Sequence, residues 1–207
     1  MKGICFIEPL FNSTIKELKE QTRRIINDKT LEKLDEYWSW REFALSQQTF
    51  GVSVEPDATI SFARYKVGEI LYLKEPYIRT NHTIYKYSED KNTIEKLRLD
   101  WQNKLFMPEK YARYFIEITD VRCERLQDIS DDDCLKEGIV EAECISERHF
   151  EMVYENGLNS IKSNNGFLLI QSNTPKEAYA ALIDKINGKG TWESNPFVWV
   201  YDYKLLK

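Results

Sequence analysis

A long apolar segment at residues 113–126 constrains the fold of this chain more than any other part of the sequence. Its apolar residues first alternate at Ile116 and Ile118, and the alternation then slips by one position to Val121 and Cys123. Strict alternation is typical of a strand with one buried face, and a slip inside a strand is typical of a β-bulge or a barrel corner. The segment therefore predicts one long, bent strand.

Shorter sequence patterns before and after this strand predict a mixture of strands and helices. Ser13 is the expected N-cap of the first helix, and Ser130 with Asp133 forms a capping box at the start of a later one. Strands are predicted at residues 4–7, 21–26, 70–75, 167–170 and 197–205, and helices at residues 13–19, 130–138 and 174–188.

This order of elements has no steady βαβ rhythm, which argues against a doubly wound parallel sheet. We predict an α+β fold, with a single domain over residues 1–207 built as a small mixed β-barrel with flanking helices. Loop insertions are expected near residues 31–58, 77–105 and 139–165.

The composition excludes several classes of function. The net charge is −5, and non-specific binding to nucleic-acid phosphates needs a basic surface, so only a local basic cleft remains possible. The four cysteines form no C-x-x-C pair and there are only two histidines, so neither a metal site nor a cofactor is expected. No apolar stretch approaches the ~18 residues of a membrane span, and the N-terminal apolar run is too short for a secretory leader. We expect a cytoplasmic protein with no membrane partner.

Lys19, Thr22 and Arg24 place an amine, a hydroxyl and a guanidinium at a predicted junction between helix and strand. If the chain is extended from Gln21 onwards, Thr22 and Arg24 project to one face, and Lys19 at the helix end leans towards the same opening. A partly desolvated lysine near arginines has a lowered pKa and is a candidate base for a threonine hydroxyl. The same residues are also compatible with a solvated basic surface.

Glu137 is a second candidate site residue, because it lies in the last turn of a predicted helix. A carboxylate there meets the negative end of the helix dipole, at a cost of roughly 0.3–1 kcal/mol. This placement is unfavourable for a purely structural glutamate, although an exposed glutamate at a helix end is also common.

Several arginines are candidates to bind an anionic ligand beside this site. Arg23 and Arg24 belong to the same cluster as Lys19, and Arg64, Arg79 and Arg113 are candidates to extend it into a basic cleft. Four aromatic residues are candidates to stack on a base or to fill the core: Trp38, Trp40, Tyr77 and Trp101.

The segment at residues 19–24, Lys-Glu-Gln-Thr-Arg-Arg, resembles the K-T-x-T-R-R signature of ASCH-domain proteins, particularly a group common in phages and prophages. Further segments at residues 65–71, 107–139 and 186–200 resemble that group in the same order. The resemblance implies a barrel related to the PUA fold and a role in recognising RNA or modified nucleotides. Glu20 stands where a threonine usually follows the lysine, and its carboxylate favours the protonated amine.

A smaller ASCH relative deacetylates N4-acetylcytidine with a lysine, a threonine three residues later and a glutamate after the short helix. By resemblance these positions fall on Lys19, Thr22 and Glu137. The three residues are therefore our candidate catalytic residues, and Arg23 and Arg24 are candidate ligand contacts beside them.

Three functions remain open from the sequence, and whether the chain is an enzyme is undecided. The first is a module that binds RNA or a modified nucleoside or nucleotide, with Arg24 on a phosphate. The second is an amidohydrolase in which Thr22 is the nucleophile, Lys19 its base and Glu137 the group that handles the leaving amine. The third is a phage or prophage accessory protein that binds a protein partner through its insertions.

Overall fold

The computed structural model describes residues 1–46, 56–79, 84–86, 100–139, 152–153, 171–172 and 174–206. Its centre is a five-stranded mixed sheet with the strand order β1-β3-β6-β9-β2. β1 and β3 are parallel, and the other neighbours are antiparallel. The strands of this sheet are β1 (Lys2–Cys5), β2 (Gln21–Ile25), β3 (Ile70–Lys74), β6 (Phe115–Arg125) and β9 (Phe197–Leu206).

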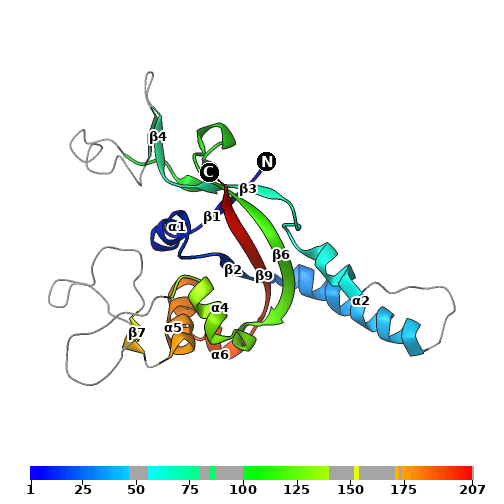
Figure 1. Cartoon of the computed structure of the whole chain (residues 1–207). Helices are drawn as coiled ribbons and strands as arrows, with labels where there is room; N and C mark the ends of the chain where they lie inside the picture. Colours follow the sequence, from blue (N-terminus) through cyan, green and yellow to red (C-terminus); the bar gives the residue numbers. More distant parts are fainter. Residues whose placement is uncertain are drawn as a thin grey trace.

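β6 and β9 are the two longest strands and curve together through the middle of the molecule (Figure 1). Their register shifts between Ile118 and Asp120. This irregularity lies where the apolar alternation slips in the sequence, so the predicted bend of the long strand is confirmed.

The sheet is mixed, as predicted, but it is not closed into a barrel. β1 and β2 are its two edges, and no ladder joins them in the described part of the chain. A cavity lies between the two edges. Its lining includes Gly3 of β1 and Arg24 of β2. Across the gap an Arg24 guanidinium nitrogen donates to the Cys5 carbonyl oxygen at 2.7 Å. A side chain rather than backbone pairing therefore connects the edges.

The first helix, α1 (Glu8–Ile15), begins and ends earlier than predicted. Pro9 lies in its first turn, where a proline needs no partner for a missing N–H, so it starts a helix instead of only ending a strand. Ser13 is inside the helix and is not its N-cap. The chain then turns at Glu17, which has φ 58°, and Lys19 follows outside the helix.

The helices α4, α5 and α6 gather at one end of the sheet (Figure 1). The N-cap bond predicted at Ser130 is present, since its hydroxyl accepts the Asp133 N–H, and the Thr174 hydroxyl likewise accepts the Glu177 N–H at the start of α5. Gly138, with φ 95°, ends the turn after α4 as predicted. The helices are α4 (Asp131–Lys136), α5 (Pro175–Asn187) and α6 (Thr191–Ser194).

The three predicted insertions have different outcomes. Much of the first is helix α2 (Asp28–Ser46), followed by a 3-10 helix at Pro56–Phe62. The second contains the hairpin of β4 (Tyr77–Arg79) and β5 (Ile84–Lys86). Of the third, only Ile139 and β7 (Met152–Val153) are among the described residues, and β7 pairs with β8 (Gln171–Ser172). The predicted strand at 167–170 lies outside the described residues. The remaining short 3-10 helices are Lys104–Phe106, Glu109–Tyr111 and Leu126–Asp128.

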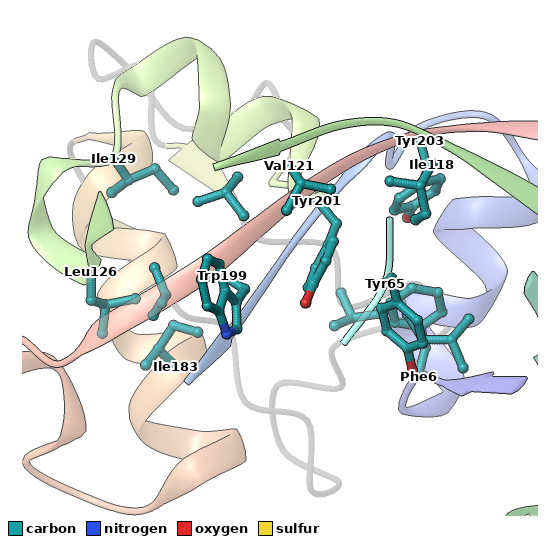
Figure 2. Packing of buried hydrophobic residues seen from close by; sticks show 14 of the residues in the cluster. Phe6, Tyr65, Ile118, Val121, Leu126, Ile129, Ile183, Trp199, Tyr201 and Tyr203 are labelled. Carbon is teal, nitrogen blue, oxygen red and sulfur yellow. The ribbon is translucent and has the colours of Figure 1, made fainter. Parts of the chain in front are cut away.

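Both faces of β9 contribute to the core, and Trp199, Tyr201 and Tyr203 form its aromatic side (Figure 2). Alternate residues of a strand share a face, so these three rings pack as one row beside Ile118 and Val121 of β6. Among the described helices, none is both long and apolar enough to cross a membrane.

Candidate functional site

Strand β2 sends its consecutive side chains to opposite faces of the sheet. Thr22 lies opposite Tyr201 and Arg24 lies opposite Trp199, so Thr22 and Arg24 share one face. Arg23 lies opposite Val200 and belongs to the other face. The prediction that Thr22 and Arg24 project together is confirmed.

Lys19 is fully buried and is held by three acceptors. Its ammonium donates to a Glu137 carboxylate oxygen at 2.5 Å, to the Glu137 carbonyl at 2.9 Å and to the Gln21 carbonyl at 2.6 Å. The pairing carboxylate therefore comes from Glu137 and not from the adjacent Glu20. The structure brings together two of the three predicted catalytic residues, although more than a hundred positions separate them in the sequence.

Burial lowers the pKa of Lys19, and the charge and hydrogen bond of Glu137 oppose that shift. The direction agrees with the sequence-based expectation, but the geometry gives the amine a different role. An ammonium has three N–H donors, and here all three are used. Lys19 thus acts as a buried positive charge that holds the end of α4 against the start of β2.

Arg23 is also buried and is surrounded by acidic groups. Its guanidinium contacts Asp133 at 3.0 Å, Glu124 at 3.3 Å and Glu137 at 3.3 Å. It also donates to the Gln21 side-chain oxygen. Burial acts to lower the pKa of Arg23, but Glu137 and the other partners raise it above the usual value. Its charge is neutralised inside the protein, which does not favour the predicted role as a ligand contact.

Arg122 extends this network and was not identified from the sequence. It pairs with Asp202 at 2.6 Å, Glu124 at 2.5 Å and Asp133 at 3.1 Å. Arg122 and Glu124 share a face of β6 because alternate residues of a strand point the same way. This alternation is the only sequence signal for the network. Asp133 and Asp202 reach Arg122 only in the folded chain. Within the described ranges, no three His, Cys, Asp or Glu side chains group as ligands for a metal ion.

A cavity of about 280 Å³ opens beside these residues, and we call it the Thr22 cavity. Thr22 and Glu137 both line it, whereas Lys19 is not a lining residue. Its lining includes the cations Arg23, Arg24 and Lys104. Its walls are largely apolar and include Leu10, Leu126, Leu182, Ile183 and Val198.

Tyr179 of α5 lines the same cavity, and sequence reasoning missed it. The residue is 1% exposed, and its hydroxyl has no hydrogen-bond partner among the described residues. Burial, together with the charge of Glu137, raises the pKa of Tyr179 well above its usual value, so the hydroxyl keeps its proton and can donate. The helical spacing of α5 predicts that Tyr179 is a core residue. Only the tertiary structure shows that its hydroxyl lacks a partner among the described residues.

The other predicted ligand contacts lie away from this cavity. Arg113 forms a bidentate pair with buried Glu75, with contacts of 2.8 and 2.9 Å from one nitrogen. Arg79 is exposed at the end of β4 and lines neither of the two larger cavities. Among the predicted arginine contacts, Arg24 and Arg64 line a cavity without being paired to a carboxylate in the described part of the chain.

The predicted stacking aromatics are used mostly in packing. Trp38 packs on Phe197 with ring centroids 5.6 Å apart, and Tyr77 packs on Tyr111 at 5.7 Å. Trp101 is half-buried, and the side chain of Trp40 lies outside the described residues.

The chain has no significant match to a protein-family model, a curated protein or a solved structure. The similarity of residues 19–24 to the ASCH signature therefore stays a prediction, and the site has to be interpreted from its own geometry.

Proposed function

We propose that this chain is a nucleoside-binding domain related to ASCH and PUA-like proteins, and that the Thr22 cavity holds the base. The observation that carries the proposal is the buried Tyr179 hydroxyl, which has no protein partner and belongs to a residue lining the cavity. A buried hydroxyl without a partner costs about 1–3 kcal/mol, so a fold that keeps one gains by pairing it with a ligand.

The polar groups of the cavity suit the edge of a base. Tyr179 supplies a donor, Thr22 supplies a hydroxyl that donates or accepts, and Glu137 supplies a carboxylate. The carboxylate oxygens of Glu137 already accept from Lys19 and Arg23, and each oxygen has a second lone pair for a ligand amine or imine. These groups come from three elements, so their spacing is fixed by the fold.

The walls and the size of the cavity suit a flat, partly apolar ligand. Leu182, Ile183 and Val198 provide apolar surface, and few polar groups interrupt it. The volume of about 280 Å³ lies near the lower end of small-molecule sites, which range from ~300 to 1,000 Å³. A single base with its sugar fits this size better than a run of stacked bases.

Binding is favoured over hydrolysis by the state of Lys19. The amidohydrolase hypothesis needs an amine with a free lone pair directed at Thr22. The ammonium instead donates to three acceptors and pairs with Glu137 at 2.5 Å. We therefore propose Thr22 and Glu137 as ligand contacts, and Lys19 as the residue that positions Glu137.

Calorimetric titration of the full chain with cytidine, uridine, adenosine, guanosine and N4-acetylcytidine tests the proposal. We expect one of these nucleosides to bind, and Tyr179→Phe to weaken its binding by about 2- to 13-fold without lowering the free energy of unfolding. The Tyr179 hydroxyl makes no hydrogen bond to a described residue, so its removal leaves no protein group without a partner.

Tyr203→Phe is the matched control. Its hydroxyl is equally buried but is bonded to Thr14 at 3.0 Å, and Tyr203 does not line the Thr22 cavity. This substitution should destabilise the fold and leave nucleoside affinity unchanged. Equal affinities in Tyr179→Phe and the native chain, or no binding of any of the five nucleosides, contradict the proposal.

A further inference from the structure

A second and larger cavity adjoins the first, and we call it the Arg64 cavity. It has a volume of about 400 Å³ and lies between the two edges of the sheet. The two cavities share Cys5, Arg24 and Ile25, so Arg24 stands at the border between them.

Three cations line the Arg64 cavity, and they come from three separate elements. Arg24 is on β2, Arg64 follows the 3-10 helix at 56–62, and Lys74 ends β3. The lining residues include no aspartate or glutamate. In the described part of the chain, none of the three cations forms an ion pair with a carboxylate.

The contacts of these cations leave donors available. Arg24 gives one nitrogen to the Cys5 carbonyl at 2.7 Å, and Lys74 donates once, to the Leu105 carbonyl, at 2.8 Å. The Arg64 guanidinium is exposed and lies 5.4 Å from the centre of the Tyr65 ring, with no hydrogen bond to a described residue. Guanidinium groups have five donors and ammonium groups have three, so most of the donors of these three residues are free.

The start of helix α2, with Asp28 in its first turn, also borders this cavity. Asn27 and Thr30 line the cavity, and the Asn27 side chain accepts the Thr30 N–H at 3.0 Å in the first turn of α2. The N-terminal end of a helix carries partial positive charge, which here has the same sign as the three cations.

Like charges gathered in a hollow repel one another, and a bound anion offsets that repulsion. Arg23 is surrounded by acids, whereas no aspartate or glutamate is among the described residues that line this cavity. A group with several acceptor oxygens and two negative charges suits arginines and a lysine that approach from different directions.

We infer that the Arg64 cavity is a phosphate-binding site formed by Arg24, Arg64 and Lys74. The inference deepens the proposed function and rests on it in one respect: with a base in the Thr22 cavity, the ligand is a nucleoside monophosphate whose phosphate passes Arg24 into the Arg64 cavity. The net charge of −5 favours such a small ligand over a long nucleic-acid chain.

The test compares nucleosides with their 5′-monophosphates, and adds inorganic pyrophosphate as a probe without a base. Calorimetric titrations use the full native chain and the double variant Arg64→Gln with Lys74→Gln. We expect the monophosphate of the bound nucleoside to bind about tenfold or more tightly than the nucleoside in the native chain. The double variant should lose this preference, should lose pyrophosphate binding, and should keep the affinity for the nucleoside.

The matched control is Lys110→Gln with Lys204→Gln, which removes the same charge from two exposed positions that line neither cavity. It should leave the preference for the monophosphate and the binding of pyrophosphate unchanged. Circular dichroism should show that both double variants are folded. Because Arg64 is exposed, the single variant Arg64→Gln provides a folded protein for the same titrations if the double variant unfolds.

The remaining outcomes contradict the phosphate site, the nucleoside site or both. Unchanged phosphate preference and pyrophosphate binding in the Arg64 and Lys74 variants overturn the phosphate site and leave the nucleoside site intact. Pyrophosphate binding that these variants abolish, without any nucleoside binding, supports the phosphate site and overturns the proposed function. No binding of nucleoside, monophosphate or pyrophosphate overturns both.

Discussion

Arg23 and Arg24 are neighbours on β2, but they lie in opposite electrostatic surroundings. Arg23 is buried against Asp133, Glu124 and Glu137, and its charge is neutralised by the protein. Arg24 faces the other side of the strand, where two cavities meet and no carboxylate pairs with it in the described part of the chain. The comparison separates cations that hold the fold together from cations that remain available to a ligand.

This difference changes the interpretation of the predicted Lys19, Thr22 and Glu137 site. The network of Lys19 and Arg23 fixes the Glu137 carboxylate from behind, since both of its oxygens are engaged. The carboxylate still lines the Thr22 cavity. The internal charges therefore act as positioning groups, and contact with a ligand falls to Thr22, Glu137 and Tyr179.

The largest expected effect is on the paired side of the comparison, with Glu137→Gln. This change leaves the ammonium of Lys19 buried without its counter-ion, so the free energy of unfolding should fall by about 3–5 kcal/mol in urea titrations. Adding Lys19→Met should recover part of the loss, because no unpaired charge then remains buried. As a control, Glu117→Gln breaks only the pair with Lys204, which is largely exposed, and should cost about 0–1 kcal/mol. A loss below 1 kcal/mol in Glu137→Gln would remove the distinction between the two groups of cations.

Gly138→Ala tests how tightly the same network is packed. Gly138 has φ 95°, and an added Cβ would lie 3.4 Å from the Cβ of Lys19. The left-handed backbone alone costs a non-glycine residue about 1–2 kcal/mol. Gly68→Ala is the matched control, since Gly68 has φ 78° with no atom within 4 Å of the added Cβ. Because 3.4 Å is an ordinary van der Waals contact, thermal unfolding should show similar losses for the two variants, and a clearly larger loss for Gly138→Ala would mean that Lys19 is packed too tightly to accept the added Cβ.

Acid titration should also distinguish the paired side. Burial acts to raise the pKa of Asp133, but hydrogen bonds from Arg23 and Gln21 outweigh it and hold the pKa below its usual value. The folded-state pKa is below the unfolded one, so the pairing stabilises the fold above about pH 4 and is lost as the pH falls through the folded-state pKa.

Asp133→Asn should therefore be less stable than the native chain by about 0.2–1 kcal/mol at pH 6, and the difference should shrink towards pH 2. Urea titrations at both pH values give the comparison. A difference that stays the same at pH 6 and pH 2 would show that charge is not its cause.

The smallest effect is expected on the unpaired side. Arg64→Gln removes an exposed cation that makes no ion pair with a described carboxylate, so the free energy of unfolding should change by about 0.5 kcal/mol or less. Chemical denaturation of this variant beside Glu137→Gln gives the contrast directly. A loss above 1 kcal/mol would assign Arg64 a structural role and weaken its assignment to a phosphate.

Local features of the fold could be predicted where neighbouring residues decide the outcome. The slip of alternation in residues 113–126 locates the bulge of β6, and Ser130 and Thr174 locate the starts of α4 and α5. The start of α1 was predicted too late, at residue 13, because a proline such as Pro9 both ends strands and starts helices, and the residues after it decide between the two.

The candidate site could be predicted only in part. Glu137 and Lys19 were identified as unusual residues, but their pairing and the full use of the ammonium donors depend on contacts between α4 and the start of β2. Tyr179 has no signal in the sequence, since its position in α5 fits a core residue. The prediction of a closed barrel was also wrong, because alternation predicts strands and does not predict whether the two edges of a sheet meet.

The sequence by itself determined the strands of the central sheet, the N-caps of α4 and α5, the bend of β6 and the grouping of cations around residues 19–24. The tertiary structure alone decided which of those cations became internal and which lined a cavity. The reason is physical: a charge is neutralised by whatever lies within a few ångströms of it, and for Arg23 those partners lie about a hundred residues away in the sequence.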